Sequence, residues 1–217
     1  MKNIIIVGTG AVAAELTSYI EDNNLIYSKK INLIGYLEYD YNIESYYKKY
    51  KLTKPVLGNI DDFTPENEQE FLIGFANINF KKIIIDKLLF KKATVSNFIH
   101  HSAIVANTSE IGKGNVIYPH CIVGPKVTIG DYNTITSYSF ISHDCILGNN
   151  NFLSTAGLAG RVEVGNNNFF GIRSTVIPSI KIGSNNTIQA GMVIDKNVND
   201  DSTIFYRFKE QITAIYK

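Results

Sequence analysis

Residues 123–153 read VGPKVTIGDYNTITSYSFISHDCILGNNNFL, and an apolar side chain returns in them at every sixth position. The same spacing continues on both sides and slips only once, by one residue. The full series is Val105, Ile111, Ile117, Val123, Ile129, Ile135, Ile141, Leu147 and Leu153, followed by Leu158, Val164, Phe170, Val176, Ile182, Ile188 and Ile194. Neither an α-helix, with about 3.6 residues per turn, nor a strand, which alternates every two residues, produces this period.

A period of six predicts a left-handed parallel β-helix. Each unit forms one short strand and one corner, three units close a triangular coil, and the apolar residue points inward every time. The asparagine- and glycine-rich corners, such as 148–151 and 165–168, are expected to take the left-handed backbone conformation of tight turns. Most chains with this repeat are acyltransferases, a function that follows here only by analogy from the fold.

The first part of the chain has a different pattern, in which strands and helices alternate. Strands are expected at Lys2–Val7, Ile31–Leu37 and Phe71–Ala76, and helices at Ala11–Glu21 and Asn79–Phe90. In the second helix we expect Ile83, Ile84 and Leu88 to face inward. This alternation predicts a small Rossmann-like parallel sheet. We therefore divide the chain into a Rossmann-like domain (1–97), the β-helix (98–199) and a tail (200–217), with no linker between the first two.

Composition narrows the class of protein. The 217-residue chain is 45% apolar and 19% charged, with a formal net charge of +1, so it is expected to be globular and not to bind nucleic acid. Lysines cluster at 48–54 and 81–92, and we interpret both clusters as solvated faces. No apolar run is long enough to predict a membrane span, and we interpret the apolar stretch Ile4–Val7 near the start as a strand rather than a signal peptide. Its two cysteines, Cys121 and Cys145, indicate reduced thiols in a cytoplasmic protein.

A glycine motif follows the first expected strand. Gly8, Gly10 and Ala13 form G-x-G-x-x-A at the start of the first helix. The glycines allow a phosphate to approach backbone amides at a helix N-terminus. Fewer than 100 residues leave no room for a complete dinucleotide domain, so a single nucleotide or a nucleotide sugar fits better than NAD. The alternative is a glycine turn without a ligand.

Ser142-His143-Asp144 is the strongest candidate for catalysis. His143 comes two residues after the inward-facing Ile141, which places it near a corner of the coil. Histidine is a natural general base near neutral pH, and the neighbouring Asp144 can hold its tautomer and stabilise the imidazolium. A purely structural role is the alternative for His143, and it is the preferred interpretation for the other histidines, which are His100, His101 and His120. No metal site is predicted.

Small residues recur in the late coils, around Gly160, at 171–174 and at 189–191. Stacked small residues leave a flat groove whose exposed amides can bind an extended ligand such as the pantetheine arm of coenzyme A. Arg173 or Lys181 could contact the phosphates of that ligand. Tight packing between coils explains the same pattern equally well.

Three features occur along the chain in this order: the GTG turn, Asn77 after the third strand, and the segment SHDCILG. On the basis of these features, the chain resembles the sugar acetyltransferases of the NeuD/PglD type over nearly its whole length. The strongest stretch is 142–194. The resemblance implies a homotrimer that binds acetyl-CoA between neighbouring β-helices and a nucleotide-linked amino sugar in the N-terminal domain. It makes His143 the general base with Asp144 beside it. It also implies sugar-nucleotide contacts at Gly8, Gly10, Glu38 and Asn77, and CoA contacts at Gly160, Ile172, Arg173, Ala190 and Gly191.

The reaction expected on this basis is acetyl transfer from acetyl-CoA to the amino group of a nucleotide-linked amino-deoxy sugar. The backbone N–H of Gly160 would face the developing oxyanion, and no metal is needed. Two alternatives stay open: O-acetylation of a sugar hydroxyl, as in sialic-acid modification, and a non-catalytic trimer that binds a sugar nucleotide.

Overall fold

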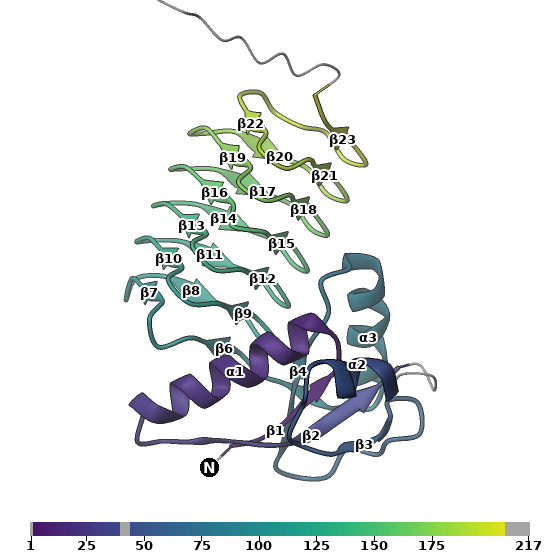
Figure 1. Ribbon diagram of the computed structural model, residues 1–217. Helices are drawn as coiled ribbons and strands as arrows, with labels where there is room; N and C mark the ends of the chain where they lie inside the picture. Colours follow the sequence, from purple (N-terminus) through teal and green to yellow (C-terminus); the bar gives the residue numbers. More distant parts are fainter. Residues whose placement is uncertain (1, 40–43, 207–217) are drawn as a thin grey trace, which may run out of the picture.

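A five-stranded parallel sheet forms the N-terminal part of the computed structural model, which describes residues 2–39 and 44–206 (Figure 1). The strand order is β3-β2-β1-β4-β5. The strands are β1 (Lys2–Val7), β2 (Ile31–Glu38), β3 (Val56–Asn59), β4 (Gln69–Ile73) and β5 (Thr94–Val95), and the helices are α1 (Ala11–Ile26), α2 (Glu44–Lys49) and α3 (Ile78–Phe90). The central strand β1 is an apolar run whose residues Ile4–Val7 are all buried, as expected for a parallel strand covered on both faces.

The helices and strands differ in places from the sequence-based expectation. Helix α1 continues past Glu21 to Ile26, and the strand expected at Phe71–Ala76 begins and ends earlier, at Gln69–Ile73. Elements α2, β3 and β5 were not predicted.

The predicted buried face of α3 is confirmed at Ile84 and Leu88, which are at most 1% exposed, but not at Ile83 or Lys81. Ile83 is 42% exposed, whereas Lys81, expected to be solvated, is only 1% exposed. The reason is that α3 packs against the coils as well as the sheet, and the Lys81 ammonium donates to Thr134 Oγ1 at 2.9 Å.

The rest of the chain forms a parallel β-solenoid with three sheets, I, II and III. Sheet I contains β6 (Phe98–Ile99), β9 (Val116–Ile117), β12 (Thr134–Ile135), β15 (Phe152–Leu153), β18 (Phe169–Phe170), β21 (Thr187–Ile188) and β23 (Thr203–Ile204). Sheet II contains β7 (Ile104–Val105), β10 (Ile122–Val123), β13 (Phe140–Ile141), β16 (Gly157–Leu158), β19 (Thr175–Val176) and β22 (Val193–Ile194). Sheet III contains β8 (Glu110–Ile111), β11 (Thr128–Ile129), β14 (Ile146–Leu147), β17 (Glu163–Val164) and β20 (Lys181–Ile182). We name the turns between them the I–II, II–III and III–I corners.

The six-residue apolar series lines the interior of this solenoid. From Ile117 onward every member is at most 4% exposed, and Val105 and Ile111 in the first coil pack partly buried against the same core. Strands of successive coils pair in register, so that Ile122 lies beside Phe140, 18 residues later. Burial of these side chains is the main force holding the coils together.

A ladder of buried asparagines stabilises the III–I corner. The side-chain oxygens of Asn115, Asn133 and Asn151 each accept from the backbone N–H of the asparagine one coil later, at 2.8 Å. Asn168 and Asn186 continue the ladder. The asparagine side chains therefore give the buried backbone N–H groups of this corner a hydrogen-bond acceptor that the backbone alone would not provide.

The corners use asparagine and glycine for different purposes. Asn150, Asn167 and Asn185 have positive φ, as expected, but so do Asp144 and Arg173, whereas Gly148 and Gly165 do not. These two glycines are needed for close stacking, since a Cβ at Gly148 would lie 2.5 Å from the carbonyl oxygen of Gly165. The expectation that glycine supplies the left-handed conformation at these positions is therefore wrong.

The slip in the repeat shortens one I–II corner. Three residues, 154–156, join β15 to β16 where four join β12 to β13. Thr155 takes a φ of 47° in this corner, and the pairing is restored at once, with Leu158 beside Ile141. A residue can thus be lost at a corner without disturbing the apolar interior.

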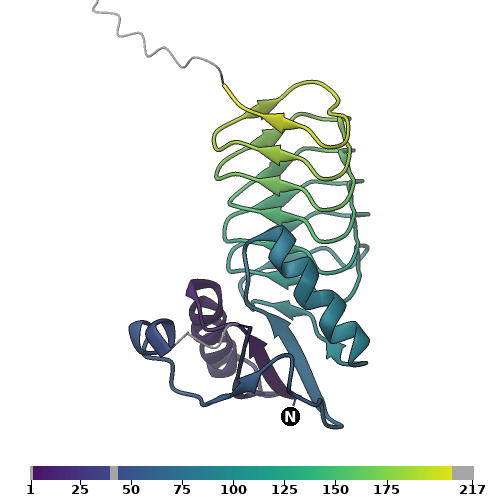
Figure 2. The ribbon, with the colours of Figure 1, turned by 90° about the vertical axis from the view of Figure 1, so that its right-hand side faces the viewer.

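The sheet and the solenoid are in direct contact. Helix α1 lies along the first coils and α3 runs beside the lower ones, as both views show (Figures 1 and 2). Tyr118 donates to Glu15 Oε2 at 3.0 Å, and Asn23 Nδ2 donates to the carbonyl of Ile99 at 3.1 Å. Within the expected tail, β23 extends sheet I by pairing with β21, and residues 207–217 lie outside the described residues. No helix among the described residues has the length and apolarity to cross a membrane.

Candidate active site

His143 and Asp144 occupy the II–III corner between β13 and β14. Ile141 is fully buried in the coil, and two residues later the chain has turned outward, so both side chains are about half exposed. His143 Nδ1 lies 2.8 Å from Asp144 Oδ2. Asp144 has a φ of 58°, which aspartate tolerates better than most side chains. The geometry therefore places the two candidate catalytic groups together, as their adjacency suggested.

Two glycines on the neighbouring coils leave room for His143. A Cβ at Gly160, one coil later, would lie 2.6 Å from both Cε1 and Nε2 of the imidazole. A Cβ at Gly124, one coil earlier, would lie 2.9 Å from the His143 backbone nitrogen. The His143 carbonyl accepts from the backbone N–H of Arg161 at 3.0 Å. The His143 imidazole thus packs against Gly160, with Cε1 and Nε2 as the ring atoms nearest to that glycine.

The surroundings keep Asp144 ionised. The hydrogen bond from His143 lowers the pKa of the Asp144 carboxyl, and the positive charges of Lys126 and Arg161 act in the same direction. An ionised Asp144 accepts a hydrogen bond from the Nδ1–H of His143, and Nε2 then carries the lone pair of the neutral ring. This is the tautomer that a general base acting through Nε2 requires.

The four candidate substrate-binding residues gather at the carboxyl edge of the N-terminal sheet, where ligands of such folds bind. Gly8 follows β1 with a φ of 111°, and a Cβ there would lie 3.1 Å from the Phe75 ring. Gly10 directly precedes α1, and a Cβ there would meet nothing within 4 Å. Glu38 ends β2, is buried, and accepts a hydrogen bond from Thr9. Asn77 caps α3 by accepting from the Phe80 N–H at 2.9 Å.

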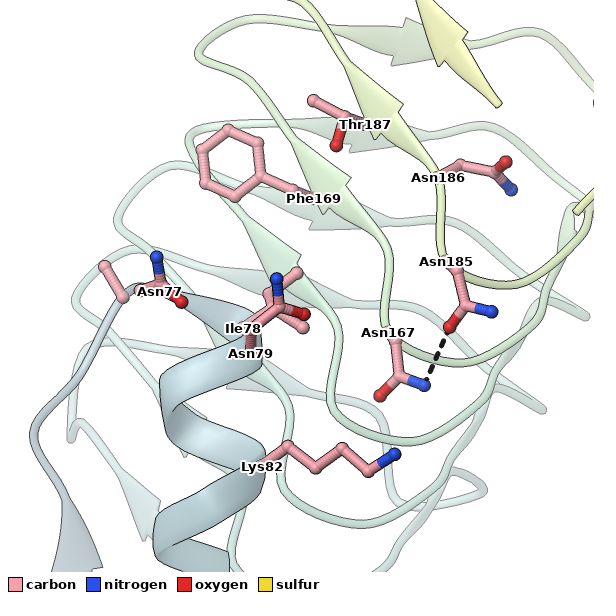
Figure 3. Close-up of a pocket in the computed structure, with 10 residues that line it drawn as sticks. Asn77, Ile78, Asn79, Lys82, Asn167, Phe169, Asn185, Asn186 and Thr187 are labelled. Atoms are coloured by element: carbon pink, nitrogen blue, oxygen red, sulfur yellow. Dashed lines mark hydrogen bonds between the residues drawn. The ribbon is translucent and has the colours of Figure 1, made fainter. Parts of the chain in front are cut away.

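A cleft of about 480 Å³ opens from Asn77 toward the solenoid (Figure 3). Its walls are the first turn of α3 and the III–I corner. Lys82 extends toward Asn167 and Asn185, which are joined by a 3.0 Å hydrogen bond, and Phe169 and Thr187 lie on the strands behind them. Sequence reasoning missed these residues. The repeated asparagine triplets were visible, but nothing in them indicated that α3 would stand beside this corner.

The candidate CoA-binding residues lie at two different corners. Gly160 is at the II–III corner with His143. Ile172, Arg173, Ala190 and Gly191 stack at the I–II corner, where the Gly191 N–H donates to the Ile172 carbonyl at 2.8 Å. A groove of about 580 Å³ there is lined by Ile172 and Ala190 and shares Phe169 and Thr187 with the cleft at Asn77. A single chain therefore does not bring these four residues to His143.

Other potentially reactive groups are poorly placed for chemistry. Cys121 and Cys145 are both buried, and burial raises the pKa of the Cys121 thiol to about 12. His120 lies at the I–II corner, where its ring stacks on Tyr138 with centroids 5.2 Å apart.

Comparison with known proteins supports the assignment of the fold. Residues 108–143 match the family described as bacterial transferase hexapeptide (six repeats), so the chain carries the hexapeptide repeat of that transferase class. No curated protein sequence matches the chain.

The solved structures similar to this chain include an N-acetyltransferase for GDP-perosamine. A mutant of GDP-perosamine N-acetyltransferase from Caulobacter crescentus, solved with CoA and GDP-perosamine, has a TM-score of 0.78 and 20% identity, covering 93% of this chain and 92% of that one. The acetyltransferase domain of PglB from Neisseria gonorrhoeae, in complex with acetyl coenzyme A, has a TM-score of 0.76 and 18% identity, covering 93% and 95%. WeeI from Acinetobacter baumannii has a TM-score of 0.77 and 18% identity, covering 92% and 94%. The chain has the fold of these proteins, which confirms the resemblance in fold indicated by the sequence.

Proposed function

We propose that this protein is an acetyl-CoA-dependent N-acetyltransferase that acts on a nucleotide-linked amino-deoxy sugar. The observation that carries the proposal is the His143–Asp144 pair, which is hydrogen-bonded at 2.8 Å at a coil corner, with Gly160 beside Nε2 leaving the space that a side chain would fill. Proteins of the same fold bind CoA together with GDP-perosamine, or acetyl coenzyme A. They support the choice of donor and of acceptor class.

In the proposed reaction, the neutral amine of the sugar attacks the thioester carbonyl. A carbon–nitrogen bond forms, and Nε2 of His143 takes a proton from the nitrogen. As the tetrahedral intermediate collapses, the carbon–sulfur bond breaks, and the imidazolium returns the proton to the departing CoA thiolate. Asp144 stabilises the imidazolium throughout, and the Gly160 N–H faces the oxyanion. A positioned general base contributes about 10²–10⁴-fold to the rate.

The N-terminal domain binds the acceptor in this proposal. The phosphates lie at the start of α1, against Gly8 and Gly10, where backbone N–H groups and the helix dipole favour an anion. Glu38 and Asn77 at the same edge contact the nucleoside and sugar. The cleft beside Asn77 leads from this edge toward the candidate CoA groove.

The proposed assembly is a homotrimer, because one chain separates its parts. Asn77 and the cleft lie against the III–I corner and four CoA candidates at the I–II corner, whereas His143 is at the II–III corner. A neighbouring copy can supply His143 to the acceptor and CoA bound by the first. We also propose a cytoplasmic location, supported by two buried cysteines that are free rather than paired.

The decisive experiment measures release of the CoA thiol from acetyl-CoA with a panel of nucleotide-linked 3-amino and 4-amino deoxysugars. His143→Ala should lower turnover by about 10²–10⁴-fold, whereas the matched control His120→Ala should not. The acetylated product should survive alkaline hydroxylamine, which cleaves an O-acetyl ester but not an amide. Cleavage would identify O-acetylation, and binding of both ligands without thiol release would identify a non-catalytic binder.

The shared site has its own test. Gly10→Val blocks the acceptor edge, where an added side chain has space, and His143→Ala removes the base. Each variant should be inactive alone, and mixed trimers formed by refolding the two together should regain activity. Mixed trimers without activity would contradict a site shared between copies.

A further inference from the structure

Three potential metal ligands meet where α1 contacts the first coil, at a corner remote along the chain from His143. His101 Nε2 lies 2.9 Å from Asp22 Oδ2, and His100 Nε2 lies 3.0 Å from the same oxygen. All three ligand atoms lie within 4.8 Å of one another. No sequence pattern links them, because Asp22 and the histidines are separated by nearly 80 residues.

The hydrogen bonds within this group leave one atom unsatisfied. His100 is 4% exposed, and its Nε2 has no hydrogen-bond partner although the Asp22 carboxylate is close. The contact is near enough for an ion pair but poorly aligned for a hydrogen bond. A buried nitrogen without a partner is costly, and an ion placed between the three atoms would coordinate it.

We propose that Asp22, His100 and His101 form a binding site for a divalent transition-metal ion of the zinc type. Zinc takes histidine nitrogens and carboxylate oxygens at about 2.0–2.2 Å, and tetrahedral geometry then sets the ligand atoms about 3.3 Å apart. The Asp22 oxygen already lies within a few tenths of an ångström of that spacing from both nitrogens. Water would take the fourth position.

Neighbouring residues hold the ligands in place, as outer-shell groups do at metal sites. Asn23, next to Asp22 on α1, accepts from the His101 backbone N–H at 2.7 Å and donates to the Ile99 carbonyl at 3.1 Å. This pair of bonds fixes the histidine segment against the helix. The two imidazole rings lie side by side, with centroids 4.4 Å apart.

Ser102 contacts the second ring nitrogen of the buried ligand. Its Oγ lies 2.8 Å from His100 Nδ1, and its backbone N–H donates to the same nitrogen at 3.2 Å. Binding of the ion by Nε2 requires the tautomer that has its proton on Nδ1; Nδ1–H then donates to Ser102 Oγ, and the hydrogen bond from the Ser102 backbone N–H is given up. The ion would tie α1 to the first coil, a role separate from the proposed acetyl transfer.

The test is a zinc titration of the full-length protein after removal of metal with a chelator, measured by calorimetry. One ion should bind per chain. Asp22→Asn and His101→Ala should each weaken binding by at least about tenfold, and Ser102→Ala by about 10–100-fold. His120→Ala, a nearby exposed histidine outside the cluster, should bind zinc as the wild type does. Cobalt bound at the site should show the visible absorption of a tetrahedral complex with nitrogen and oxygen ligands.

Thermal unfolding gives a second measurement that does not depend on activity. Zinc should raise the unfolding temperature of the wild type by mass action and, at the same concentration, should raise that of His101→Ala by clearly less. Asp22 and His101 are partly exposed, so both variants should fold without metal. A wild type that takes up no zinc, or zinc binding that persists unchanged in Asp22→Asn and His101→Ala, would overturn the proposal.

Discussion

Replacing Gly160 with alanine tests whether the seat of His143 governs the proposed reaction. The added Cβ would lie 2.6 Å from Cε1 and Nε2 of the imidazole, whereas ordinary contacts begin at 3.4 Å. The backbone of Gly160 cannot retreat easily, because its carbonyl accepts from the Ser179 N–H at 3.0 Å in the next coil. The imidazole must therefore move. Its side chain is about half exposed, and it can swing toward solvent.

The expected effect is a loss of rate without a loss of stability. Moving a catalytic group by about 1 Å costs on the order of 10²-fold in rate, and we expect kcat to fall by 10- to 10²-fold. Because the ring leaves no buried contact behind, the free energy of unfolding should change by less than about 0.5 kcal/mol. Thiol release at saturating acetyl-CoA and acceptor gives the first quantity, and urea unfolding gives the second.

A double variant separates this explanation from others. If Gly160→Ala acts through the position of His143, it should have no further effect on the residual activity of His143→Ala. A further loss in the double variant would refute the reasoning. So would a rise in the KM for acetyl-CoA with kcat unchanged, since that result would place the new methyl group against the donor.

Three further predictions concern the charge pair, the buried lysine and the asparagine ladder. Asp144→Asn should lower kcat by about tenfold or more with little change in either KM, because the imidazole loses its anionic partner; an unchanged kcat would exclude Asp144 from the mechanism. Burial lowers the pKa of Lys81 from 10.5 to about 7, so that between these values the unfolded chain binds more protons than the folded one. Relative to Lys81→Met, the free energy of unfolding of the wild type should then rise by about 1.4 kcal/mol per pH unit across that range. Urea unfolding of both proteins between about pH 7.5 and 9 measures this difference, and the same pH dependence in the two proteins would contradict the prediction. Asn151→Ala should cost about 2–4 kcal/mol in chemical unfolding, because it leaves buried polar groups of the ladder unpaired. Asn185→Ala, at an exposed position of the same kind of corner, should cost less than about 1 kcal/mol.

The repeat made most of the solenoid predictable. Each apolar residue in the series had one plausible direction, and the single slip between Leu153 and Leu158 located the short corner to within a few residues. Glu38 was joined to Gly8 only through the resemblance to the NeuD/PglD-type acetyltransferases, and the structure places both at one edge, where strand ends of a parallel sheet meet. The adjacency of His143 and Asp144 needed no folding argument. The left-handed winding of the solenoid stays a prediction.

What the sequence could not provide are relations between distant segments. Lys81 looked solvated and Ile83 buried, because helical periodicity does not say that a second surface covers α3. Ile172 and Arg173 lie at a different corner from His143, and a pattern of small residues does not indicate which corner of the coil each residue occupies. The meeting of Asp22 with His100 and His101 depends on how α1 docks against the first coil, which local patterns do not specify.

The number of stacked coils also determines the distance between the N-terminal sheet and His143. Paired strands of adjacent coils are spaced about 4.8 Å apart, and every coil below β13 adds one such step between the N-terminal sheet and the level of His143. Insertion of one complete coil would preserve the pairing between successive coils and raise the imidazole by that distance. The number of coils, rather than any single side chain, therefore sets how far a bound substrate must reach to arrive at His143.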